Sequence, residues 1–328
     1  MKVLVTGASG FVGQALIKSL LLDSYEVRGL VRQSSTALPS AAEQVVIGDL
    51  VDLTLSSSST VLREAFKGVD AVVHTAARVH VMNDKASNPL DEFRKVNLNA
   101  TLVLARLSAA SGVKRFVFLS SIKVNGEMTS SDQVFTPDDL HIPDDPYGLS
   151  KYEAEKGLLS LMQETNMEVV IIRPPLVYGP GVKGNFASMI KWMSKPLPLP
   201  FGAIHNQRSL VALDNLVSFI SLCVDRKKSL KAANQIFLIS DGQDVSTTQL
   251  LKKVGEALNL QFPSGIQAWL VPVPVCIMTF FANILGKTDL ANRLFGSLQV
   301  DSSKTYDLLG WTPVVTMEEQ LAKMPKEI

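Results

Sequence analysis

The sequence has few cysteines, little net charge and no long uninterrupted hydrophobic run, and each shortage excludes a class of protein. Its two cysteines, Cys223 and Cys276, lie inside apolar runs and not in a Cys/His cluster. We therefore expect two buried thiols, without a disulfide framework or a metal site. The formal net charge is only +1. A chain so nearly neutral lacks the positive field that holds a nucleic acid backbone, so nucleic acid is not expected as a partner.

The longest apolar segment runs from Trp269 to Leu285 and is interrupted by Pro272 and Pro274. It is shorter than the roughly 20 apolar residues that a spanning helix needs, so no integral membrane segment is expected. The segment predicts a helix that is buried or faces a partner, with attachment to a membrane surface as the alternative. The chain enters an apolar strand at Val3 without the basic and apolar lead of a signal peptide, so we expect a cytoplasmic protein.

As far as Arg173, short apolar runs rich in β-branched residues alternate with longer segments of helical period. This alternation is typical of a doubly wound α/β fold, with helices on both faces of a parallel sheet and ligands outside the carboxyl ends of the strands. The expected strands are Val3–Val5, Val27–Val31, Val45–Ile47, Ala71–His74, Phe116–Leu119 and Val169–Ile172, and the main expected helices are Val12–Leu22, Phe93–Ala110 and Tyr147–Gln163.

Beyond Arg173 the rhythm changes to turns rich in proline and glycine, mixed with short helices and isolated strands. We expect residues 1–173 to form a dinucleotide-binding domain and residues 174–328 to form a smaller mixed C-terminal substrate lobe. A chain that crosses back from the second part to the first is left open.

Three glycines directly follow the first strand and lead into a helix, in the spacing Gly-x-x-Gly-x-x-Gly. Gly7 and Gly10 have no Cβ, so the backbone there can approach a pyrophosphate, and Gly13 allows close packing of helix on strand. The N–H groups of the first helical turn, which includes Phe11 and Val12, would meet the phosphate charge. The pattern in this setting predicts a dinucleotide site.

The end of the second strand bears on the choice of nicotinamide cofactor. An acidic residue there binds the ribose 2′-hydroxyl of NAD(H). This sequence has none and instead reads Leu30-Val31-Arg32-Gln33-Ser34. Arg32 is placed to pair with a 2′-phosphate, so NADP(H) is favoured over NAD(H), with a solvated surface arginine as the alternative.

Tyr147 and Lys151 are four residues apart at the start of an expected helix and so share one face. A nearby ammonium group is expected to lower the pKa of the phenol, so that Tyr147 can exchange a proton with a substrate hydroxyl near neutral pH. The fifth strand ends in Ser120-Ser121, which places a hydroxyl at the active edge of the sheet.

These glycines, this serine pair and the Tyr-x-x-x-Lys motif together resemble the extended short-chain dehydrogenase/reductase family, also called the NAD-dependent epimerase/dehydratase family. Within it the chain is most similar to UDP-hexose 4-epimerases and to bacterial reductases of 4-keto sugar nucleotides. The resemblance implies a Rossmann-type fold and cofactor contacts from Asp49, Leu50 and Ala76, besides Tyr147 and Lys151. It assigns the hydroxyl that orients the substrate to Ser121, with Ser120 as the fallback.

The family's 4,6-dehydratases carry adjacent Asp-Glu after the catalytic hydroxyl, where this sequence has Ile122 and Lys123. A dehydratase is therefore not expected.

The same resemblance suggests the residues that bind the substrate. Asn185 and Arg208 match the family's contacts to the sugar-nucleotide diphosphate, and Phe201 matches the segment that packs on uracil. Arg78 and His80 would face the sugar if the loop after the fourth strand follows the family's path, with exposure on the surface as an equal alternative. The family's second phosphate-binding arginine has only Arg293 as a loose counterpart, which leaves uridine against deoxythymidine open.

Three functions remain open. The leading hypothesis is an NAD(P)-dependent oxidoreductase that transfers hydride at C4 of a UDP-sugar in polysaccharide biosynthesis, as a 4-ketoreductase does. A UDP-glucose or UDP-N-acetylglucosamine 4-epimerase shares all of its catalytic residues and is the alternative. A silent nucleotide-binding sensor is a remote third, because it would not need Ser121, Tyr147 and Lys151 together. The family also pairs the helices Phe93–Ala110 and Tyr147–Gln163 across a two-fold axis, so a homodimer through a four-helix bundle is expected.

Overall fold

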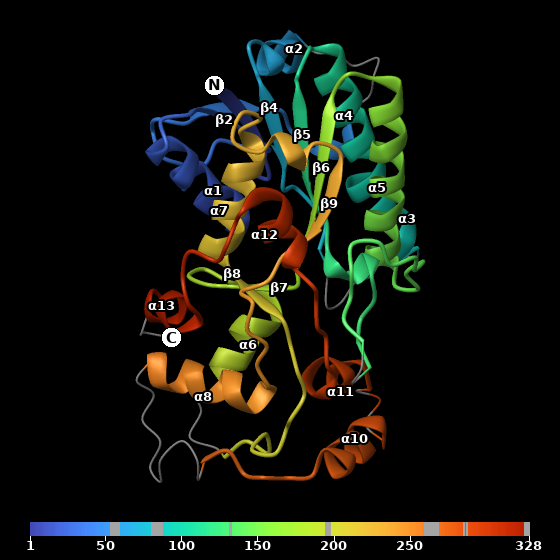
Figure 1. Cartoon of the computed structure of the whole chain (residues 1–328), viewed down its shortest axis with the longest axis vertical. Coiled ribbons are helices and arrows are strands. Elements are labelled where there is room, and N and C mark those ends of the chain that lie inside the picture. Colours follow the sequence, from blue (N-terminus) through green and yellow to red (C-terminus); the bar gives the residue numbers. More distant parts are fainter. Residues whose placement is uncertain are drawn as a thin grey trace.

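The computed structural model describes residues 1–52, 60–79, 88–130, 133–193, 198–258, 269–284, 286 and 288–324. Within them, seven parallel strands form one sheet in the order β3-β2-β1-β4-β5-β6-β9 (Figure 1). The strands are β1 (Lys2–Thr6), β2 (Glu26–Val31), β3 (Glu43–Val46), β4 (Ala71–His74), β5 (Arg115–Leu119), β6 (Glu168–Arg173) and β9 (Gln235–Leu238). The order reverses between β1 and β4, which is the doubly wound topology predicted from the sequence.

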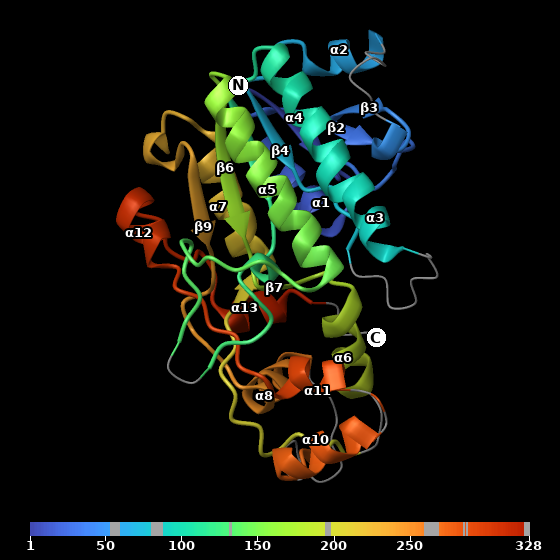
Figure 2. The same cartoon turned by 90° about the vertical axis from the view of Figure 1, so that its right-hand side faces the viewer.

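Helices cover both faces of this sheet (Figure 2). On one face α1 (Phe11–Leu22) and α7 (Leu213–Val224) pack on Val3, Val5 and the alternate residues of the neighbouring strands. On the other face α2 (Thr60–Phe66), α4 (Thr101–Ala110) and α5 (Pro146–Glu164) pack on Leu4 and its counterparts. The two apolar faces explain why the strands read as nearly continuous hydrophobic runs.

The predicted fold class is confirmed, and the predicted elements fall on observed ones. The expected helix Phe93–Ala110 is the largest departure from regular geometry. It consists of α3 (Pro89–Arg94), a π-helical turn η2 (Lys95–Ala100) and α4 in direct succession. The π turn inserts an extra residue per turn, which a 3.6-residue period does not predict.

The chain after residue 173 returns to the large sheet. β9 pairs with β6, α7 packs against α1, and α12 (Ser303–Leu309) contacts β9. Elements from beyond residue 173 therefore take part in the large sheet and in the helices that cover it.

The remaining elements form a smaller lobe below the carboxyl ends of the strands in Figure 1. They are the two-stranded sheet of β7 (Leu176–Tyr178) and β8 (Leu210–Ala212) with α6 (Gly184–Met193), α8 (Thr247–Ala257), α10 (Val275–Ile284), α11 (Thr288–Phe295) and α13 (Met317–Ala322). The lobe has its own apolar core, built around Tyr178, Phe186 and Trp269. Short 3₁₀ turns complete the described chain at η1 (Leu50–Asp52), η3 (Ile122–Val124) and η4 (Leu230–Ala232).

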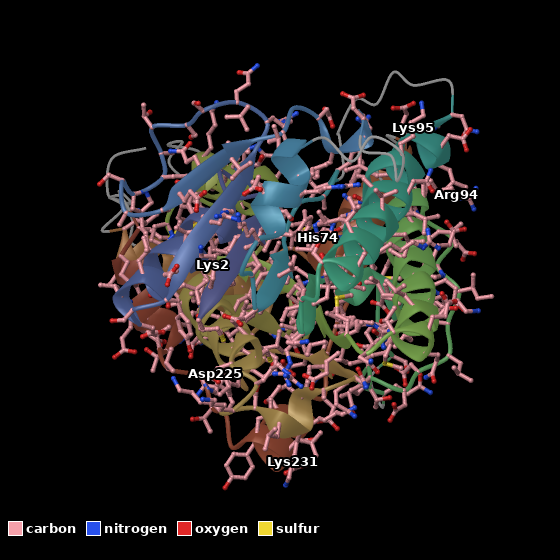
Figure 3. All side chains as sticks on the ribbon, turned by 90° about the horizontal axis from the view of Figure 1, so that it is seen from above. Lys2, His74, Arg94, Lys95, Asp225 and Lys231 are labelled. Carbon is pink, nitrogen blue, oxygen red and sulfur yellow. The ribbon has the colours of Figure 1, made fainter. Side chains whose placement is uncertain are left out.

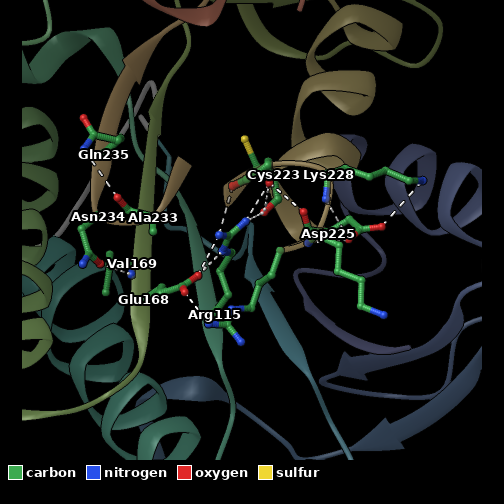
Figure 4. A network of polar contacts seen from close by, with 12 residues as sticks. Arg115, Glu168, Val169, Cys223, Asp225, Lys228, Ala233, Asn234 and Gln235 are labelled. Carbon is green, nitrogen blue, oxygen red and sulfur yellow. Dashed lines mark hydrogen bonds and ion pairs between the residues drawn. The ribbon is translucent and has the colours of Figure 1, made fainter. Parts of the chain in front are cut away.

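A buried arginine closes the opposite end of the sheet, where β5 begins. Arg115 is fully buried and donates to Glu168, to the Cys223 carbonyl and to the Ser229 hydroxyl at 2.7–2.8 Å (Figure 4). It thereby joins β5 and β6 to the end of α7. The amino ends of these strands are therefore covered, and the carboxyl ends remain open.

Two expectations for the apolar segments are corrected. Cys223 is buried as predicted, but Cys276 is exposed. It lies on α10, which buries none of its described residues and exposes Phe280 by 61% and Phe281 by 58%. The helix is therefore not buried, because α10 lies at the outer end of the small lobe (Figures 1 and 2), and its contact with a partner or a membrane surface stays a prediction. Across the described residues no helix has the length and hydrophobicity to span a membrane.

Candidate active site

The glycine turn after β1 has the geometry that a dinucleotide cradle requires. Gly7 has a φ of +65°, and a Cβ atom at Gly13 would lie 2.2 Å from the Gly7 carbonyl oxygen. Gly10 donates its N–H to that same oxygen at 2.8 Å and is the N-cap of α1 without using a side chain. The helix therefore begins with backbone N–H groups alone, and Phe11 and Val12 are its first two residues. Such a terminus fits the pyrophosphate of a dinucleotide.

The turn after β4 lies against the glycine turn. A Cβ atom on Gly7 would lie 2.7 Å from the Ala76 nitrogen, and Thr75 donates its hydroxyl to the Thr6 carbonyl at 2.6 Å. The Ala76 backbone therefore lies directly against the glycine turn at Gly7.

Arg32, Asp49 and Leu50 lie beyond the carboxyl ends of β2 and β3. Arg32 is 79% exposed, and one of its Nη atoms is 4.0 Å from an Asp49 carboxylate oxygen. Asp49 also accepts a hydrogen bond from the N–H of Val51, in the 3₁₀ turn that Leu50 begins. No carboxylate stands at the end of β2 itself, where Val31 is followed by Arg32.

Tyr147 and Ser121 meet at the carboxyl end of β5. Tyr147 lies in the first turn of α5, which begins after Asp145, whose carboxylate accepts from the Gly148 N–H at 3.1 Å. Ser121 caps the 3₁₀ turn η3 and hydrogen-bonds the Tyr147 phenol. The ring of Phe93 lies edge-on to Tyr147 at 5.9 Å. The phenol and the hydroxyl are therefore held together on the open edge of the sheet.

Lys151 lies one turn further along α5 and points back to β5. Its Nζ donates to the Leu119 carbonyl at 2.9 Å and lies 4.5 Å from the centre of the Phe118 ring. Burial lowers the pKa of Lys151 to about 7, and the charge of Glu155 opposes this shift.

The expectation that Lys151 lowers the pKa of Tyr147 is wrong for this structure. Loss of solvent around the phenol raises the pKa of Tyr147 to about 12, and the hydrogen bond from Ser121 opposes that rise. The negative charge of Asp145 adds to the rise. The ammonium group of Lys151 is directed to the Leu119 carbonyl, so the phenol obtains its local support from Ser121.

The choice between the two serines has a geometric answer. Ser121 faces Tyr147, whereas Ser120 is buried and donates to Glu155 at 2.5 Å. Glu155 in turn pairs with Arg173 on β6. Ser121 is therefore the hydroxyl available beside the phenol, and Ser120 belongs to a buried ionic network behind it.

Sequence reasoning missed Asn97, which lies in the π turn. Its side chain accepts from the Arg78 N–H at 2.9 Å and donates to the Arg78 carbonyl and to the Ser150 hydroxyl, each at 3.0 Å. Asn97 thereby fixes the loop after β4 to the first turns of α5. Sequence reasoning also missed Glu155, although a carboxylate four residues after Lys151 on the inner face of a helix was a usable signal.

His74, at the end of β4, lies in the interior of the molecule, while Arg94 and Lys95 lie at its edge (Figure 3). Its ring nitrogens contact the hydroxyls of Thr6 and Thr101 at 2.6 and 2.8 Å. Burial, with the charge of Lys151, lowers the pKa of His74 to about 3, so the ring is neutral and joins β1, β4 and α4.

The residues expected to bind substrate are brought only partly together. Arg208 donates to the carbonyls of Arg293 and Gly296 at 2.9 Å, and Phe201 lies 6.5 Å from Phe295, so these two residues converge on the end of α11. Asn185 lies in the first turn of α6. Arg78 lies in the loop after β4, with its guanidinium 5.7 Å from the Phe93 ring beside Tyr147. His80 lies outside the described residues.

In the described part of the chain, no cluster of His, Cys, Asp or Glu could hold a metal ion.

Comparisons with known proteins agree with this arrangement. The model of the NAD dependent epimerase/dehydratase family matches residues 3–239. A UDP-glucose 4-epimerase of Vibrio cholerae is 47% identical over 319 residues, which cover 97% of this chain and 92% of the relative. The N-acetyl-alpha-D-glucosaminyl-diphospho-ditrans,octacis-undecaprenol 4-epimerase of Escherichia coli O157:H7 is 31% identical over 267 residues, which cover 80% and 74% of the two chains.

Among solved structures, UDP-glucuronic acid 4-epimerase from Bacillus cereus in complex with NAD has the same fold. Its TM-score is 0.74 at 20% identity, and the match covers 99% of this chain and 97% of that one.

Proposed function

Because the chain belongs to the NAD dependent epimerase/dehydratase family, we propose that it is a 4-epimerase of UDP-hexoses that works with a bound nicotinamide dinucleotide. The family resemblance drawn from the sequence is confirmed. The observation that carries the proposal is that Tyr147, Ser121 and Lys151 lie at the carboxyl end of β5, in the same parallel sheet whose strand β1 ends in the glycine turn. The 47% identity to a UDP-glucose 4-epimerase favours epimerisation over the 4-ketoreductase that led among our sequence hypotheses.

The proposed roles follow from the positions of the side chains. When bound, the dinucleotide supplies the acceptor and donor of hydride at C4 of the sugar. Tyr147 takes the proton of the C4 hydroxyl as the C4 hydride leaves, and returns a proton to the C4 oxygen after the 4-keto sugar has turned over. Ser121 orients that oxygen, and Lys151 would bring its positive charge to the bound dinucleotide. In the second half of the reaction the hydride and a proton return to the sugar, so no external oxidant or reductant is consumed.

The rest of the site supports a sugar-nucleotide substrate. We assign Arg208 and Asn185 to its diphosphate and Phe201 to its base, with Arg78 beside the sugar. We further propose that residues 1–173 bind mainly the dinucleotide and that the lobe beyond residue 174 binds mainly the substrate. A cytoplasmic location stays a prediction from the sequence.

The cofactor does not itself discriminate between the two reactions. An epimerase returns its dinucleotide to the starting oxidation state, so either NAD or NADP can serve. Arg32 and the missing acid at the end of β2 favour NADP(H), whereas the Bacillus cereus 4-epimerase structure holds NAD. We keep the preference for NADP(H) as a prediction from Arg32.

The purified protein provides the direct test. We expect it to interconvert UDP-glucose and UDP-galactose, or their N-acetylated forms, without any added dinucleotide, and to release a nicotinamide dinucleotide when denatured. Activity that depends stoichiometrically on added NADPH, with a 4-keto sugar as the substrate, would replace the epimerase by the reductase.

A second candidate substrate is a sugar diphosphate linked to a polyprenol, as in the name of the Escherichia coli relative. The observation that favours it is α10. No charged residue or histidine occurs between Glu256 and Lys287, and α10 exposes Ile277, Phe280, Phe281 and Ile284. An exposed helix with bulky apolar residues can rest in the interface of a bilayer, where such a substrate resides.

This candidate has its own experiment. We expect the protein to co-sediment with vesicles of phosphatidylethanolamine and phosphatidylglycerol, and the double variant Phe280→Ser/Phe281→Ser to lose this binding and the turnover of a polyprenyl-diphosphate sugar in those vesicles. Its turnover of UDP-sugars should stay unchanged. Equal turnover of the lipid-linked sugar by both proteins would remove this candidate.

A further inference from the structure

Three charged side chains are buried together behind the candidate catalytic residues. Lys151 is 1% exposed, Glu155 is 2% exposed and Arg173 is 5% exposed. Burying charges away from water is costly, so side chains buried in this way need partners that are closely fitted. The contacts around Glu155 are of this kind.

Both oxygens of the Glu155 carboxylate are held. Ser120 donates to Oε1 at 2.5 Å, and Arg173 donates its Nε to the carboxylate at 3.0 and 3.2 Å and an Nη to Oε2 at 2.6 Å. Arg173 is itself fixed by donating to the Asn125 side chain at 3.0 Å. Residues from β6 and from the end of β5 therefore hold one carboxylate at a set position on α5.

That position is one helical turn from Lys151, on the same inner face of α5. The hydrogen-bond acceptor of Lys151 is a neutral carbonyl, that of Leu119. The charge of Lys151 interacts with Glu155 on α5 and with His74 on β4, Arg173 on β6 pairs with Glu155, and Tyr147 precedes Lys151 by one turn of α5. Because the histidine is neutral and the arginine is positive, Glu155 supplies the negative charge.

We propose that Glu155, fixed by Arg173 and Ser120, is a positioning residue that holds the Lys151 ammonium group in place and in its charged form. The inference rests on the proposed function, since it concerns the charge that Lys151 brings to the bound dinucleotide. The inference agrees with the two effects on the pKa of Lys151: burial lowers this pKa to about 7, and the charge of Glu155 opposes the lowering.

The competing explanation is that Glu155 and Arg173 only tie α5 to β6. A purely structural pair would affect stability, and would lower activity by the same factor at every pH. A carboxylate that keeps Lys151 charged predicts a loss that grows as pH rises, because without it Lys151 loses its proton at lower pH. The pH profile therefore separates the two explanations.

The test compares Glu155→Gln with the wild type in kcat/KM for UDP-hexose and in dinucleotide affinity, each measured from pH 6 to pH 9. We expect the alkaline fall of both profiles to move down by about one pH unit or more. At pH 8 the variant should then lose about fivefold more kcat/KM than at pH 6, and more still if the shift exceeds one unit. Glu164→Gln, on an exposed residue of the same helix, is the matched control and should leave both profiles unchanged.

Further variants keep the test decisive if Glu155→Gln does not fold. Glu155→Gln/Arg173→Gln removes both buried charges and avoids an unpaired arginine; because a positive charge is lost as well, its downward shift should be smaller than that of Glu155→Gln. Glu155→Asp keeps a carboxylate at greater distance and should show a smaller shift in the same direction. The inference is overturned if the variants that fold lose activity by the same factor at every pH, with the alkaline fall of the profile at its wild-type position.

The dinucleotide readout separates this inference from the proposed function. If the wild type binds dinucleotide but does not epimerise UDP-hexoses, the proposed function fails. The pH dependence of dinucleotide affinity in the same variants then still decides the role of Glu155.

Discussion

The Ser121 hydroxyl lies beside the phenol of Tyr147 and favours its ionised form, whereas the loss of solvent around the phenol opposes ionisation. We assign proton transfer at C4 to Tyr147, with Ser121 as the orienting hydroxyl, because Ser120 is committed to Glu155. We therefore expect Tyr147→Phe to lower kcat by at least about a hundredfold while dinucleotide affinity stays within a few-fold. Steady-state kinetics together with dinucleotide titration measure both quantities. A variant that keeps most of its activity would remove Tyr147 from the proton-transfer role.

Arg32 carries the prediction on cofactor choice. Its side chain is 79% exposed and its contact with Asp49 is 4.0 Å long, so the pair is weak and Arg32 is free to move to a phosphate. A charge-assisted contact to a 2′-phosphate contributes about 1.5–3 kcal/mol, or roughly one to two decades in affinity. Arg32→Ala should therefore raise the Kd for NADPH by about tenfold or more, and leave that for NADH nearly unchanged.

The comparison of the two dinucleotides is its own control, because NADH lacks only the 2′-phosphate. Equal shifts of both constants, measured by fluorescence titration, would mean that Arg32 contacts the shared part of the molecule or nothing specific.

Residue types and spacings in the sequence predicted the glycine turn and the shared helix face of Tyr147 and Lys151, because these residues stand directly after a strand or at the start of a helix, and the family resemblance assigned Ser121. They did not predict the direction of the Tyr147 pKa, since spacing shows which charges are near and not how much solvent is lost. Asn97 was missed for a related reason. Its contacts to Arg78 and Ser150 depend on a π turn that helical periodicity does not reveal.

At the scale of elements, the expected strands were found because buried parallel strands require continuous β-branched and apolar runs, which are easily recognised. The last strand, β9, was not expected. It follows a long excursion through the small lobe, and its four residues carry no signal that distinguishes a seventh strand from an isolated one. The exposure of α10 could not be predicted either, because the sequence of an apolar helix does not show whether the rest of the fold covers it.

The junction of β1 and α1 gives a prediction at this scale. A Cβ atom at Gly13 would lie 2.2 Å from the Gly7 carbonyl oxygen, which is backbone and cannot swing away. Gly13→Ala should therefore displace the glycine turn, weaken dinucleotide binding by more than about tenfold and destabilise the fold by about 1–3 kcal/mol. Dinucleotide titration and thermal unfolding measure the two effects.

Gly157→Ala is the matched control for that substitution. A Cβ atom there would meet the flexible end of the Leu102 side chain at 2.7 Å, between α5 and α4. The leucine can move, and alanine favours the helix. Dinucleotide affinity should stay as in the wild type, and a loss as large as that of Gly13→Ala would mean that close packing at Gly13 is not the cause.

At the scale of the whole molecule, the two ends of the sheet are used differently. Arg115 and its partners cover the amino end of β5, and the small lobe faces the carboxyl ends of the strands. Because α7, β9 and α12 return from beyond residue 173 to pack on the large sheet, the lobe is connected to it by several chain passages. The lobe is therefore held at a fixed distance from the glycine turn, as a substrate that spans both parts requires.

The outer faces of α4 and α5 carry the last prediction. The two helices lie side by side over one face of the sheet (Figure 2). Val103 packs against the apolar core and is only partly buried, so part of its side chain is left on the side of α4 that the sheet does not cover. A second copy that packed α4 and α5 against the same helices would cover this side. We therefore expect a homodimer built on a four-helix bundle.

Light scattering at micromolar concentration should give twice the mass of one chain for the wild type. Val103→Glu should give monomers, because a carboxylate in the centre of the bundle would lose its water without gaining a partner. Lys114→Glu, on an exposed residue before β5 and away from these helices, should remain dimeric. A monomeric wild type would contradict the dimer, and a Val103→Glu variant that stays dimeric would place the contact on another surface.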